Sequence, residues 1–370
     1  MGLRCILHMD KKQYAFIGSY AESDQPGLYV CSYDSETGSL TLLDQVSGLP
    51  NPTFLDIDDS RSIIYAITEG VDANQQKCGA AAAYAFDPFA GKLLLLNQEV
   101  TLPATTCHIT LDRTRQCLMV TSYHGGMVGL SPLQQDGRIG TTADIQRHQG
   151  SSVLPVQDRP RAHSATMDAA NRFAIVCDLG MDQLIVYKLD AANHRLIPHS
   201  QTAIAPGSGP RHFALHPRLP YGYVINELNS TITALSYAEE AGQLTVIQTV
   251  STLPADFQAD NACADIHISP DGCFIYGSNR GHDSLAVYAI DEQSGKLTLV
   301  EHAPTLGGHP RNFAISPDGR FVLVANRDGN NIVTFSRDAQ TGKLTPTGSV
   351  LTLSKPVCIK FRTLPAGDLR

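Results

Sequence analysis

Two neighbouring stretches of the sequence decide the fold: ADIHISPDGCFIYGSNRGHDSLAVYAIDEQSGKL (264–297) and PRNFAISPDGRFVLVANRDGNNIVTFSRDAQTGKL (310–344). Each begins with a short alternating segment, passes through an SPDG turn into a run of β-branched and aromatic residues, and adds a third such run before a Gly-Lys-Leu turn. Short alternating or apolar runs bounded by turn residues are typical of β-strands. The two stretches therefore predict two copies of one multi-stranded unit.

The turn that ends both stretches recurs along the chain and marks the period of the repeat. Seven copies are present, ending at Leu40, Leu93, Ile139, Leu196, Leu244, Leu297 and Leu344. They are separated by 46 to 57 residues, about 51 on average. Repeats of this length indicate a solenoid or a propeller.

A second marker, the alternating segment that begins each unit, gives the same count. It occupies residues 52–58, 107–112, 162–168, 210–216, 264–269, 310–316 and 356–362. A β-branched or aromatic run follows six of these segments, but the seventh lies at the C-terminus without a successor. The N-terminus supplies the missing strands in YAFIGSY (14–20), GLYVCSYD (27–34) and SLTLLDQ (39–45).

We therefore predict an all-β fold: a seven-bladed β-propeller of four-stranded blades, closed where N-terminal strands join the C-terminal strand. Closure of this kind removes exposed sheet edges. A pair of β-sandwiches would also show short strands with regular turns, but it explains neither the seven equal units nor the terminal overlap. The prediction treats residues 1–370 as one propeller domain, with residues 1–12 as an N-terminal extension.

Composition argues against several classes of partner. The 370 residues include 28 Lys and Arg against 36 Asp and Glu, a formal net charge of −8, which argues against nucleic acid or an acidic membrane surface. No apolar run is long enough for a membrane span, and the N-terminus lacks the order of a signal peptide. The nine cysteines form no CxxC pair, so we expect free thiols and a cytoplasmic location.

Propeller geometry brings the starts of the first strands and the ends of the second strands to one mouth of the central channel. The residues placed there are His108, Arg161, His163, Arg211, His212 and Arg311 from the starts, and Glu69, Tyr123, Asp178, Glu227, Arg280 and Arg327 from the ends. The planar fork of Arg matches carboxylate and phosphate oxygens. In an otherwise acidic chain, this group predicts a small anionic substrate.

Four of these residues are the candidate catalytic group. His163 begins a channel strand and is the best candidate for acid-base work. Glu227 ends a second strand, where burial would raise its pKa towards that of a general base; the alternative is a salt bridge to a neighbouring Arg. Arg211 and Arg280 are expected to bind or stabilise negative charge, with ion pairs between blades as the alternative.

Six further residues are candidates for substrate binding: His108, Asp178, His212, Arg311, Arg327 and Glu69. Their structural alternatives are ion pairs between blades, hydrogen bonds to loops and, for Asp178, capping of the turn at Gly180. The chain has no GxSxG, HExxH, Walker or complete GxGxxG motif, so we expect neither a metal nor an organic cofactor.

Residues 207–232, 264–288 and 307–335 resemble the lactonase family of seven-bladed propellers, and the resemblance runs from about Tyr14 to Arg362. That family includes bacterial 6-phosphogluconolactonase and the fungal 3-carboxy-cis,cis-muconate lactonizing enzyme. The active site proposed for the latter has a His, two Arg and a Glu. By motif, the resemblance implies His163 in RAHS, Arg211 in GPRH, Glu227 in NEL and Arg280 in SNRG.

One part of the chain departs from the repeat. The turn QQDGRIG (134–140) is degenerate, and the segment from Gly140 to Arg161 is long for a connection between strands. Long connections of this kind are often functional. We therefore take this segment as a candidate substrate-specific lid.

The resemblance implies hydrolysis of a small anionic sugar lactone, with 6-phosphogluconolactone giving 6-phosphogluconate as the leading reaction. Lactonisation of a carboxylated muconate is the enzymatic alternative. A non-catalytic propeller that binds a protein or a sugar acid remains open, as does, more weakly, a metal-dependent lactonase of another propeller family. The expected partner is a small anion, with no nucleic acid and no membrane.

Overall fold

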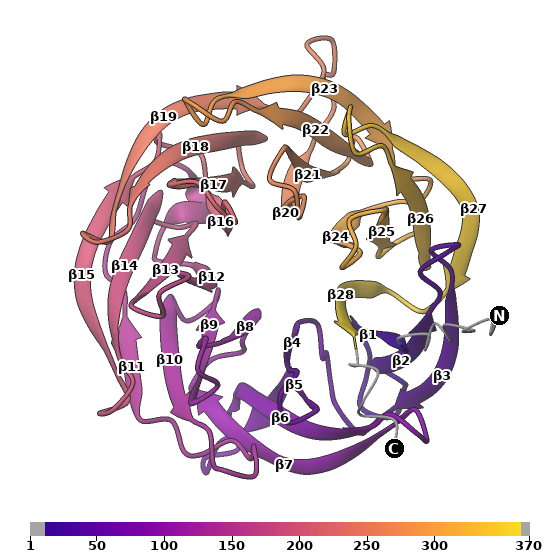
Figure 1. Cartoon of the computed structure of the whole chain (residues 1–370). Helices are drawn as coiled ribbons and strands as arrows, with labels where there is room; N and C mark the ends of the chain where they lie inside the picture. The colour runs from indigo at the N-terminus through magenta and orange to yellow at the C-terminus, as the bar shows by residue number, and fades with distance from the viewer. Residues whose placement is uncertain (1–11, 364–370) are drawn as a thin grey trace, which may run out of the picture.

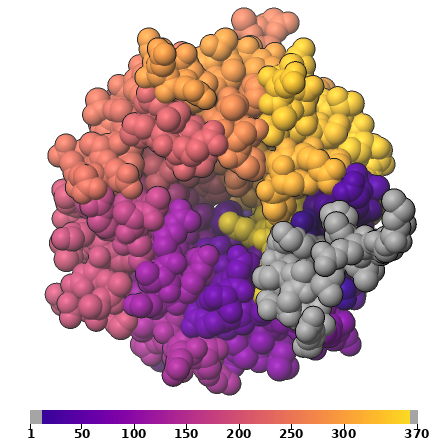
Figure 2. All heavy atoms as spheres, in the orientation of Figure 1, coloured from indigo at the N-terminus to yellow at the C-terminus, as the bar shows by residue number. Residues whose placement is uncertain are grey.

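The computed structural model describes residues 12–363, which form seven four-stranded antiparallel sheets in a ring around a central channel (Figure 1). The space-filling view shows the ring hollowed at its centre (Figure 2). The predicted all-β propeller with seven blades of four strands is confirmed. No helix within the described residues has the length and hydropathy needed to cross a membrane.

Blades are numbered here from the N-terminus, and each is given from its inner to its outer strand. Blade 1 contains β28 (Pro356–Thr363), β1 (Gln13–Ser19), β2 (Leu28–Tyr33) and β3 (Leu40–Val46). Blade 2 contains β4 (Leu55–Asp58), β5 (Ile63–Val71), β6 (Lys77–Asp87) and β7 (Lys92–Leu102). Blade 3 contains β8 (His108–Leu111), β9 (Cys117–Ser122), β10 (Met127–Pro132) and β11 (Asp144–Arg147). Blade 4 contains β12 (Ala162–Met167), β13 (Phe173–Asp178), β14 (Gln183–Asp190) and β15 (Arg195–Ala203), and a short 3-10 helix, η1 (Pro155–Gln157), precedes it.

The remaining blades follow the same order. Blade 5 contains β16 (Pro210–Leu215), β17 (Tyr221–Asn226), β18 (Thr231–Ala238) and β19 (Gln243–Ser251). Blade 6 contains β20 (Ala262–Ile268), β21 (Phe274–Arg280), β22 (Ser284–Ile290) and β23 (Leu297–Pro304). Blade 7 contains β24 (Pro310–Ile315), β25 (Phe321–Asn326), β26 (Asn331–Arg337) and β27 (Leu344–Thr352). All seven predicted first-strand markers coincide with the innermost strands.

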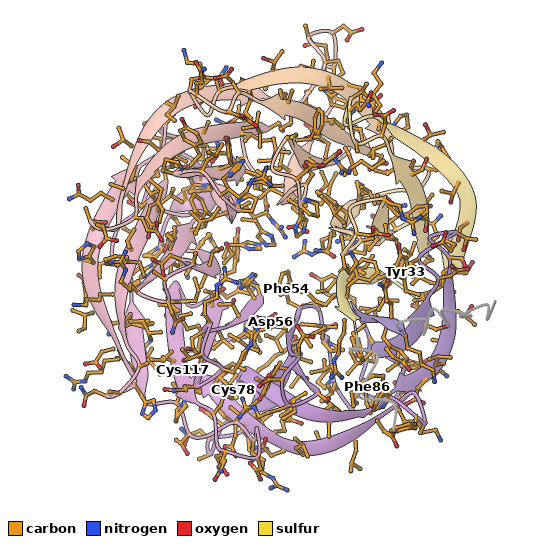
Figure 3. All side chains as sticks on the ribbon, in the orientation of Figure 1. Tyr33, Phe54, Asp56, Cys78, Phe86 and Cys117 are labelled. Carbon is orange, nitrogen blue, oxygen red and sulfur yellow. The ribbon has the colours of Figure 1, made fainter. Side chains whose placement is uncertain are left out.

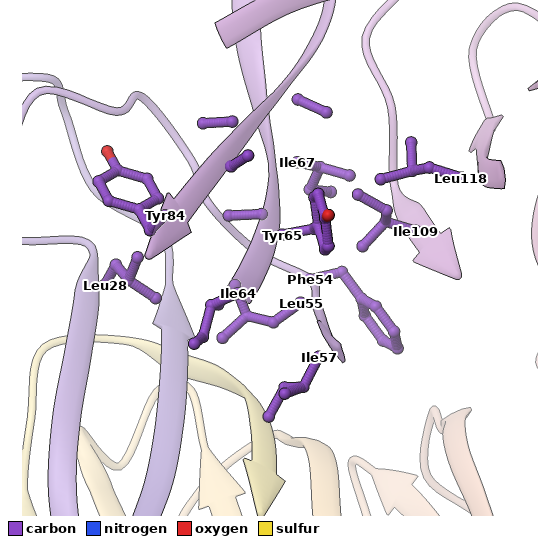
Figure 4. Packing of buried hydrophobic residues seen from close by; sticks show 14 of the residues in the cluster. Leu28, Phe54, Leu55, Ile57, Ile64, Tyr65, Ile67, Tyr84, Ile109 and Leu118 are labelled. Carbon is purple, nitrogen blue, oxygen red and sulfur yellow. The ribbon is translucent and has the colours of Figure 1, made fainter. Parts of the chain in front are cut away.

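The core lies between adjacent sheets, which explains the strand patterns in the sequence. Second strands such as β9 are buried along their whole length because sheets cover both faces, so they consist of apolar and small residues without alternation. Outer strands such as β19 alternate because one face meets solvent. Figure 4 shows side chains of blade 2, including Ile64 and Tyr65, packed between Leu28 of blade 1 and Ile109 of blade 3. The buried Tyr65 hydroxyl donates a 2.7 Å hydrogen bond to the Gly137 carbonyl, which satisfies its polar end.

Strand β28 closes the ring by pairing antiparallel with β1, and the two lie side by side in Figure 1. Ile17 is opposite Ile359 in this ladder, and both are buried. Phe86 of blade 2, labelled in Figure 3, packs edge-to-face on Phe16 of β1 at 4.9 Å between ring centroids. The predicted terminal closure is confirmed; the predicted extension, residues 1–12, lies outside the described residues except for Lys12.

Blade 3 departs from the repeat, as its degenerate turn indicated. Ile139 forms a single bridge with Leu133 instead of starting a fourth strand, and the outer strand is the short β11. The backbone of Ile139 is held by Asn97 of β7, which accepts from its N–H at 3.0 Å and donates to its carbonyl at 2.8 Å. The segment is therefore tied to the neighbouring blade.

Ile359 gives a test of the ring closure. Ile359→Asp places an unpartnered carboxylate in a site where the wild-type residue is 2% exposed, and we expect loss of the cooperative fold, because burying such a charge costs several kcal/mol, comparable to a typical total stability of about 5–15 kcal/mol. Ile359→Val, the control, should cost about 0.5–1.5 kcal/mol. Urea unfolding followed by circular dichroism measures both. A wild-type midpoint for Ile359→Asp would show that the β28 closure is dispensable.

Candidate active site

Three predicted site residues owe their position to the same local feature, a β-bulge at the start of a first strand. In blade 5 the register passes from Pro210 to His212 on β16 while β17 advances one residue, so Arg211 is the extra residue. His163 in blade 4 and Arg311 in blade 7 are extra in the same way. Bulges interrupt the ladder and re-aim a side chain, and they are common next to active sites.

A cavity of about 300 Å³, termed the mouth cavity, opens where these strands begin. Its lining comprises Tyr20, Asn51, Thr53, Thr68, Glu69, Thr105, Thr106, Cys107, Tyr123, His124, His163, Glu227 and Arg311. These residues lie at or next to the starts of first strands and the ends of second strands. The lining thus follows the predicted propeller geometry, and it includes His163 and Glu227 from the candidate catalytic group.

Glu227 is held by two guanidinium groups. Its Oε2 lies 2.8 Å from Nε of Arg211 and 2.9 Å from Nη2 of Arg280. Burial raises the pKa of this carboxyl, but Arg280 and Arg211 more than offset that effect, and the pKa is lowered below its usual value. The predicted increase in the Glu227 pKa is therefore wrong, because two ion pairs outweigh desolvation. The salt-bridge alternative describes the structure.

Arg211 and Arg280 lie behind Glu227 and are not part of the cavity lining. Arg280 Nη2 also donates to the Cys263 carbonyl at 2.6 Å, and Arg211 Nη1 donates to the Ala264 carbonyl at 2.6 Å. Burial and repulsion from Arg311 and Arg280 lower the pKa of Arg211 to about 9, so it stays positively charged at neutral pH. The two groups orient the carboxylate and leave Oε1 without a protein partner among the described residues.

His163 lies in the lining, with its carbonyl hydrogen-bonded and its ring in contact with the rings of His212, at 5.2 Å between centroids, and Tyr123, at 6.0 Å. Its carbonyl accepts hydrogen bonds from Oγ1 of Thr121 at 2.8 Å and from Sγ of Cys107 at 3.2 Å. No described residue bonds to the buried Nδ1 of the ring. Burial, with positive charge on Arg211, holds the pKa of His163 well below its usual value. The imidazole is therefore neutral at neutral pH and keeps a lone pair for accepting a proton.

Arg311 is the cation of the mouth cavity that remains available for a ligand. Its guanidinium carbon lies 5.6 Å from the centroid of the Tyr20 ring. Within residues 12–363 it makes no ion pair and no hydrogen bond. Glu69, also in the lining, is instead bound to Lys77 at 2.6 Å and to Asn51 at 3.1 Å. Among the described residues that line the mouth cavity, the Arg311 guanidinium on blade 7 is thus the cationic group without an ion-pair partner.

Four of the six predicted binding residues lie outside the lining of the mouth cavity: Asp178, Arg327, His108 and His212. Asp178 is buried and accepts hydrogen bonds from Nδ1 of His148 at 2.6 Å and from the backbone N–H of Arg161 at 2.8 Å. Arg327 pairs with the adjacent Asp328 at 2.7 Å. Both arrangements are structural, and they do not favour the predicted contact with substrate.

His108 and His212, the last two predicted binding residues, form an aromatic layer with Phe54 across the channel. His108 lies 4.2 Å from Phe54 and 5.5 Å from His212 between ring centroids. A second cavity of about 420 Å³, the channel cavity, lies beyond this layer and is lined by all three residues. Figure 3 shows Phe54 and Asp56 at the inner edge of the ring. The layer therefore separates the mouth cavity from the rest of the channel.

The segment from Gly140 to Arg161 is anchored beside the mouth. The buried His148–Asp178 contact and a 2.5 Å hydrogen bond from Ser152 to Asp182 hold it. None of its described residues lines the mouth cavity, although the Arg161 guanidinium lies 4.9 Å from the centroid of the Tyr123 ring. Its role as a lid stays a prediction.

A family model described as "Lactonase, 7-bladed beta-propeller" matches residues 14–361. The chain belongs to this lactonase family. It is 35% identical over 302 residues to the 6-phosphogluconolactonase of Bacillus subtilis (strain 168), covering 82% of this chain and 84% of that protein. It is also 35% identical over 306 residues to the 6-phosphogluconolactonase of Formosa agariphila, covering 81% and 85%.

Solved structures agree with the family assignment. The periplasmic gluconolactonase of Pseudomonas aeruginosa superposes with a TM-score of 0.89 at 30% identity, covering 96% of this chain and 100% of that one. A protein from Lactobacillus plantarum gives a TM-score of 0.88 at 31% identity, covering 95% and 99%.

Sequence reasoning assigned no role to two residues that lie at or next to the site. Tyr123 was placed at the mouth by its strand, and it lines the cavity; burial raises the pKa of its hydroxyl, so it stays protonated. Asp265 is four residues before the SPDG turn of blade 6, as Asn312 is in blade 7, so it follows the position that Arg311 occupies. Aligning the first strands on these turns would have shown a carboxylate at a position that holds His212 and Asn312 in the neighbouring blades.

The aromatic layer gives the fold a pH dependence. Burial, with repulsion from a protonated His212 and from Lys360, holds the pKa of His108 well below its usual value. The unfolded chain therefore takes up this proton first, and stability falls as the pH drops below about 6.5, by up to about 1.4 kcal/mol per pH unit for each such group. His108→Phe removes one titrating group.

We expect the free energy of unfolding to fall less in His108→Phe than in the wild type between pH 6.5 and 5.5. Urea unfolding at the two pH values measures the difference. Equal losses in the two proteins would mean that His108 titrates alike in the folded and unfolded states.

Proposed function

We propose that this protein hydrolyses a small anionic sugar lactone, and that 6-phosphogluconolactone is its substrate. The observation that carries the proposal is one cavity lined by both a neutral His163 imidazole and an Arg311 guanidinium without a protein partner among the described residues. The names of the relatives from Bacillus subtilis and Formosa agariphila support the choice of lactone.

His163 acts as the general base. It takes a proton from water as the water oxygen attacks the lactone carbonyl carbon, and it returns that proton to the ring oxygen as the ring C–O bond breaks. The product acid then ionises and releases one proton. Acid-base assistance of this kind contributes roughly 10²- to 10⁴-fold.

Glu227 and Tyr123 complete the reaction site. Glu227 stays ionised because of its two ion pairs, so its free Oε1 accepts a hydrogen bond from the attacking water and favours the imidazolium form of His163. Tyr123 keeps its proton and donates a hydrogen bond to the oxyanion that develops on the carbonyl. Donors aimed at developing charge in a site shielded from water are among the largest contributions to catalysis.

Arg311 binds the anionic group of the substrate. Arg211, Arg280 and Arg311 carry three positive charges around the single carboxylate of Glu227, and only Arg311 lines the cavity. The excess of positive charge suits a phosphate, whose oxygens a guanidinium binds through two parallel hydrogen bonds.

The purified protein should be assayed with 6-phosphogluconolactone, with gluconolactone and with a carboxymuconate, each corrected for its uncatalysed rate. We expect the highest kcat/KM with the phosphorylated lactone. Turnover of the muconate alone would favour the lactonizing alternative, and turnover of none would favour a binding protein.

The charge on Arg311 should set the preference for phosphate. Arg311→Ala is expected to raise KM for the phosphorylated lactone by about 10- to 100-fold, because hydrogen bonds to charged groups contribute about 1.5–3 kcal/mol. KM for gluconolactone should change less than about threefold. Arg320→Ala, which removes an exposed guanidinium elsewhere on blade 7, is the control. Equal effects of Arg311→Ala on both lactones would contradict the assignment.

The low pKa of His163 should appear in the pH profile. Protonation removes the base, and since its pKa is lowered, the acid limb of kcat/KM should lie below pH 6.5, the usual value for His. His163→Gln should lose roughly 10²- to 10⁴-fold in kcat. Rates measured from pH 4.5 to 8 decide the point; an acid limb above pH 6.5, or a limb retained in His163→Gln, would exclude His163 as the base.

A further inference from the structure

Asp265 is a buried carboxylate with no place in the mechanism above. It lies in the bulge of β20, at the position that holds His212 in blade 5 and Asn312 in blade 7. Its Oδ1 accepts from Nδ1 of His212 at 2.7 Å and from the Ile266 N–H at 3.0 Å. Its Oδ2 accepts from Nε2 of His267 at 2.9 Å and from the side-chain amide of Asn312. A carboxylate with this many donors is ionised.

Asp265 determines which nitrogen of His212 carries the proton. Burial and repulsion from Arg211 lower the pKa of His212 to about 4, so the ring is neutral, with one N–H. Because Asp265 accepts that N–H at Nδ1, the lone pair is at Nε2. Nη1 of Arg211 donates to this Nε2 at 3.2 Å. The other tautomer would place two donors against each other.

The contacts continue from Arg211 to the mouth cavity. Arg211 is 2% exposed, and its Nε pairs with Glu227 at 2.8 Å. Its Nη1 also donates to the carbonyl of Ala264, the residue before Asp265. A continuous series of contacts thus leads from Asp265 through His212 and Arg211 to the carboxylate in the cavity lining.

We propose that Asp265 is a positioning residue for the reaction: it fixes the tautomer of His212, which holds Arg211, which in turn orients Glu227. The proposal rests on the proposed function. Asp265 also supplies a second negative charge that acts on the buried Arg211, besides that of Glu227.

A merely structural role is the competing explanation, since Asp265 also ties β20 to β24 through Asn312. The positioning role and the structural role can be tested separately, because the two carboxylate oxygens of Asp265 bind different partners. Oδ1 faces the series that leads to Arg211, whereas Oδ2 binds His267, whose half-exposed ring lines the channel cavity beyond the aromatic layer. One substitution on each side therefore tests the two explanations: a change at His212 that removes its contact with Arg211, and a change at His267 that removes its contact with Oδ2 of Asp265.

Four variants test the proposal. His212→Asn keeps an amide donor for Asp265 but does not reach Arg211, whereas His212→Gln extends an acceptor towards it. His267→Leu removes the contact on the other oxygen, and Asp265→Asn removes the charge itself. Steady-state kinetics with 6-phosphogluconolactone and urea unfolding are measured for each.

We expect Asp265→Asn and His212→Asn to lower kcat by about 10- to 100-fold, the range for residues that orient a reacting group through another. KM should change less than about threefold, because Arg311 holds the phosphate. His212→Gln should recover part of the lost kcat, and His267→Leu should stay within about twofold of the wild type. A loss in His267→Leu equal to that in His212→Asn, or no recovery in His212→Gln, would overturn the proposal. If Asp265→Asn does not fold, the His212 pair and His267→Leu decide.

The tautomer can be read without any substrate. Ring ¹⁵N shifts of His212, assigned by their loss in His212→Asn, should show the proton on Nδ1 in the wild-type protein. A proton on Nε2 would overturn the positioning proposal whatever the enzyme hydrolyses. A wild-type protein with the Nδ1 tautomer but no lactone turnover would instead refute the proposed function alone.

Discussion

The ladder between β1 and β28 is the constraint on which the site depends. It joins the two ends of the chain in one sheet and leaves the ring no open edge. The mouth cavity is lined from blades 1 to 5 and from blade 7, so the residues that form it keep their distances only while the ring is closed. Tyr20, just after β1, and Arg311, on β24, lie within 5.6 Å of each other although almost the whole sequence separates them. Closure of the ring thus brings residues from separate blades together around one cavity.

Inside the closed ring, the β-bulges decide what each blade contributes. A regular antiparallel strand alternates its side chains between the two faces of its sheet, and both faces of an inner strand are packed. One extra residue breaks that alternation, and in blades 4, 5 and 7 it is a His or an Arg. Such side chains would be costly between two sheets without partners. The same local irregularity thereby provides polar side chains at the mouth while the rest of each strand stays in the apolar core.

The repeats made the fold predictable, because seven copies of two markers specify blade number, strand order and closure. They also brought His163, Arg211, Glu227, Arg280 and Arg311 to one mouth. They did not reveal which cation pairs with which anion. Glu227 shows why: its pKa depends on a balance between burial and two guanidinium groups at 2.8 and 2.9 Å, and neither distance can be read from a motif. Asp178 and Arg327 have the right strand positions, but their side chains are taken by His148 and by the adjacent Asp328.

The distribution of charge separates two tasks among the blades. Arg211 and Arg280 share the single carboxylate of Glu227, in a network on and beside blades 5 and 6 that a substitution would disturb as a whole. Arg311, on blade 7, contacts the Tyr20 ring and makes no ion pair or hydrogen bond with its side chain among the described residues, although its positive charge acts on Glu227 and Arg211. The proposed anion-binding residue thus lies on a different blade from the network around Glu227, so substitutions can test the two parts of the site separately.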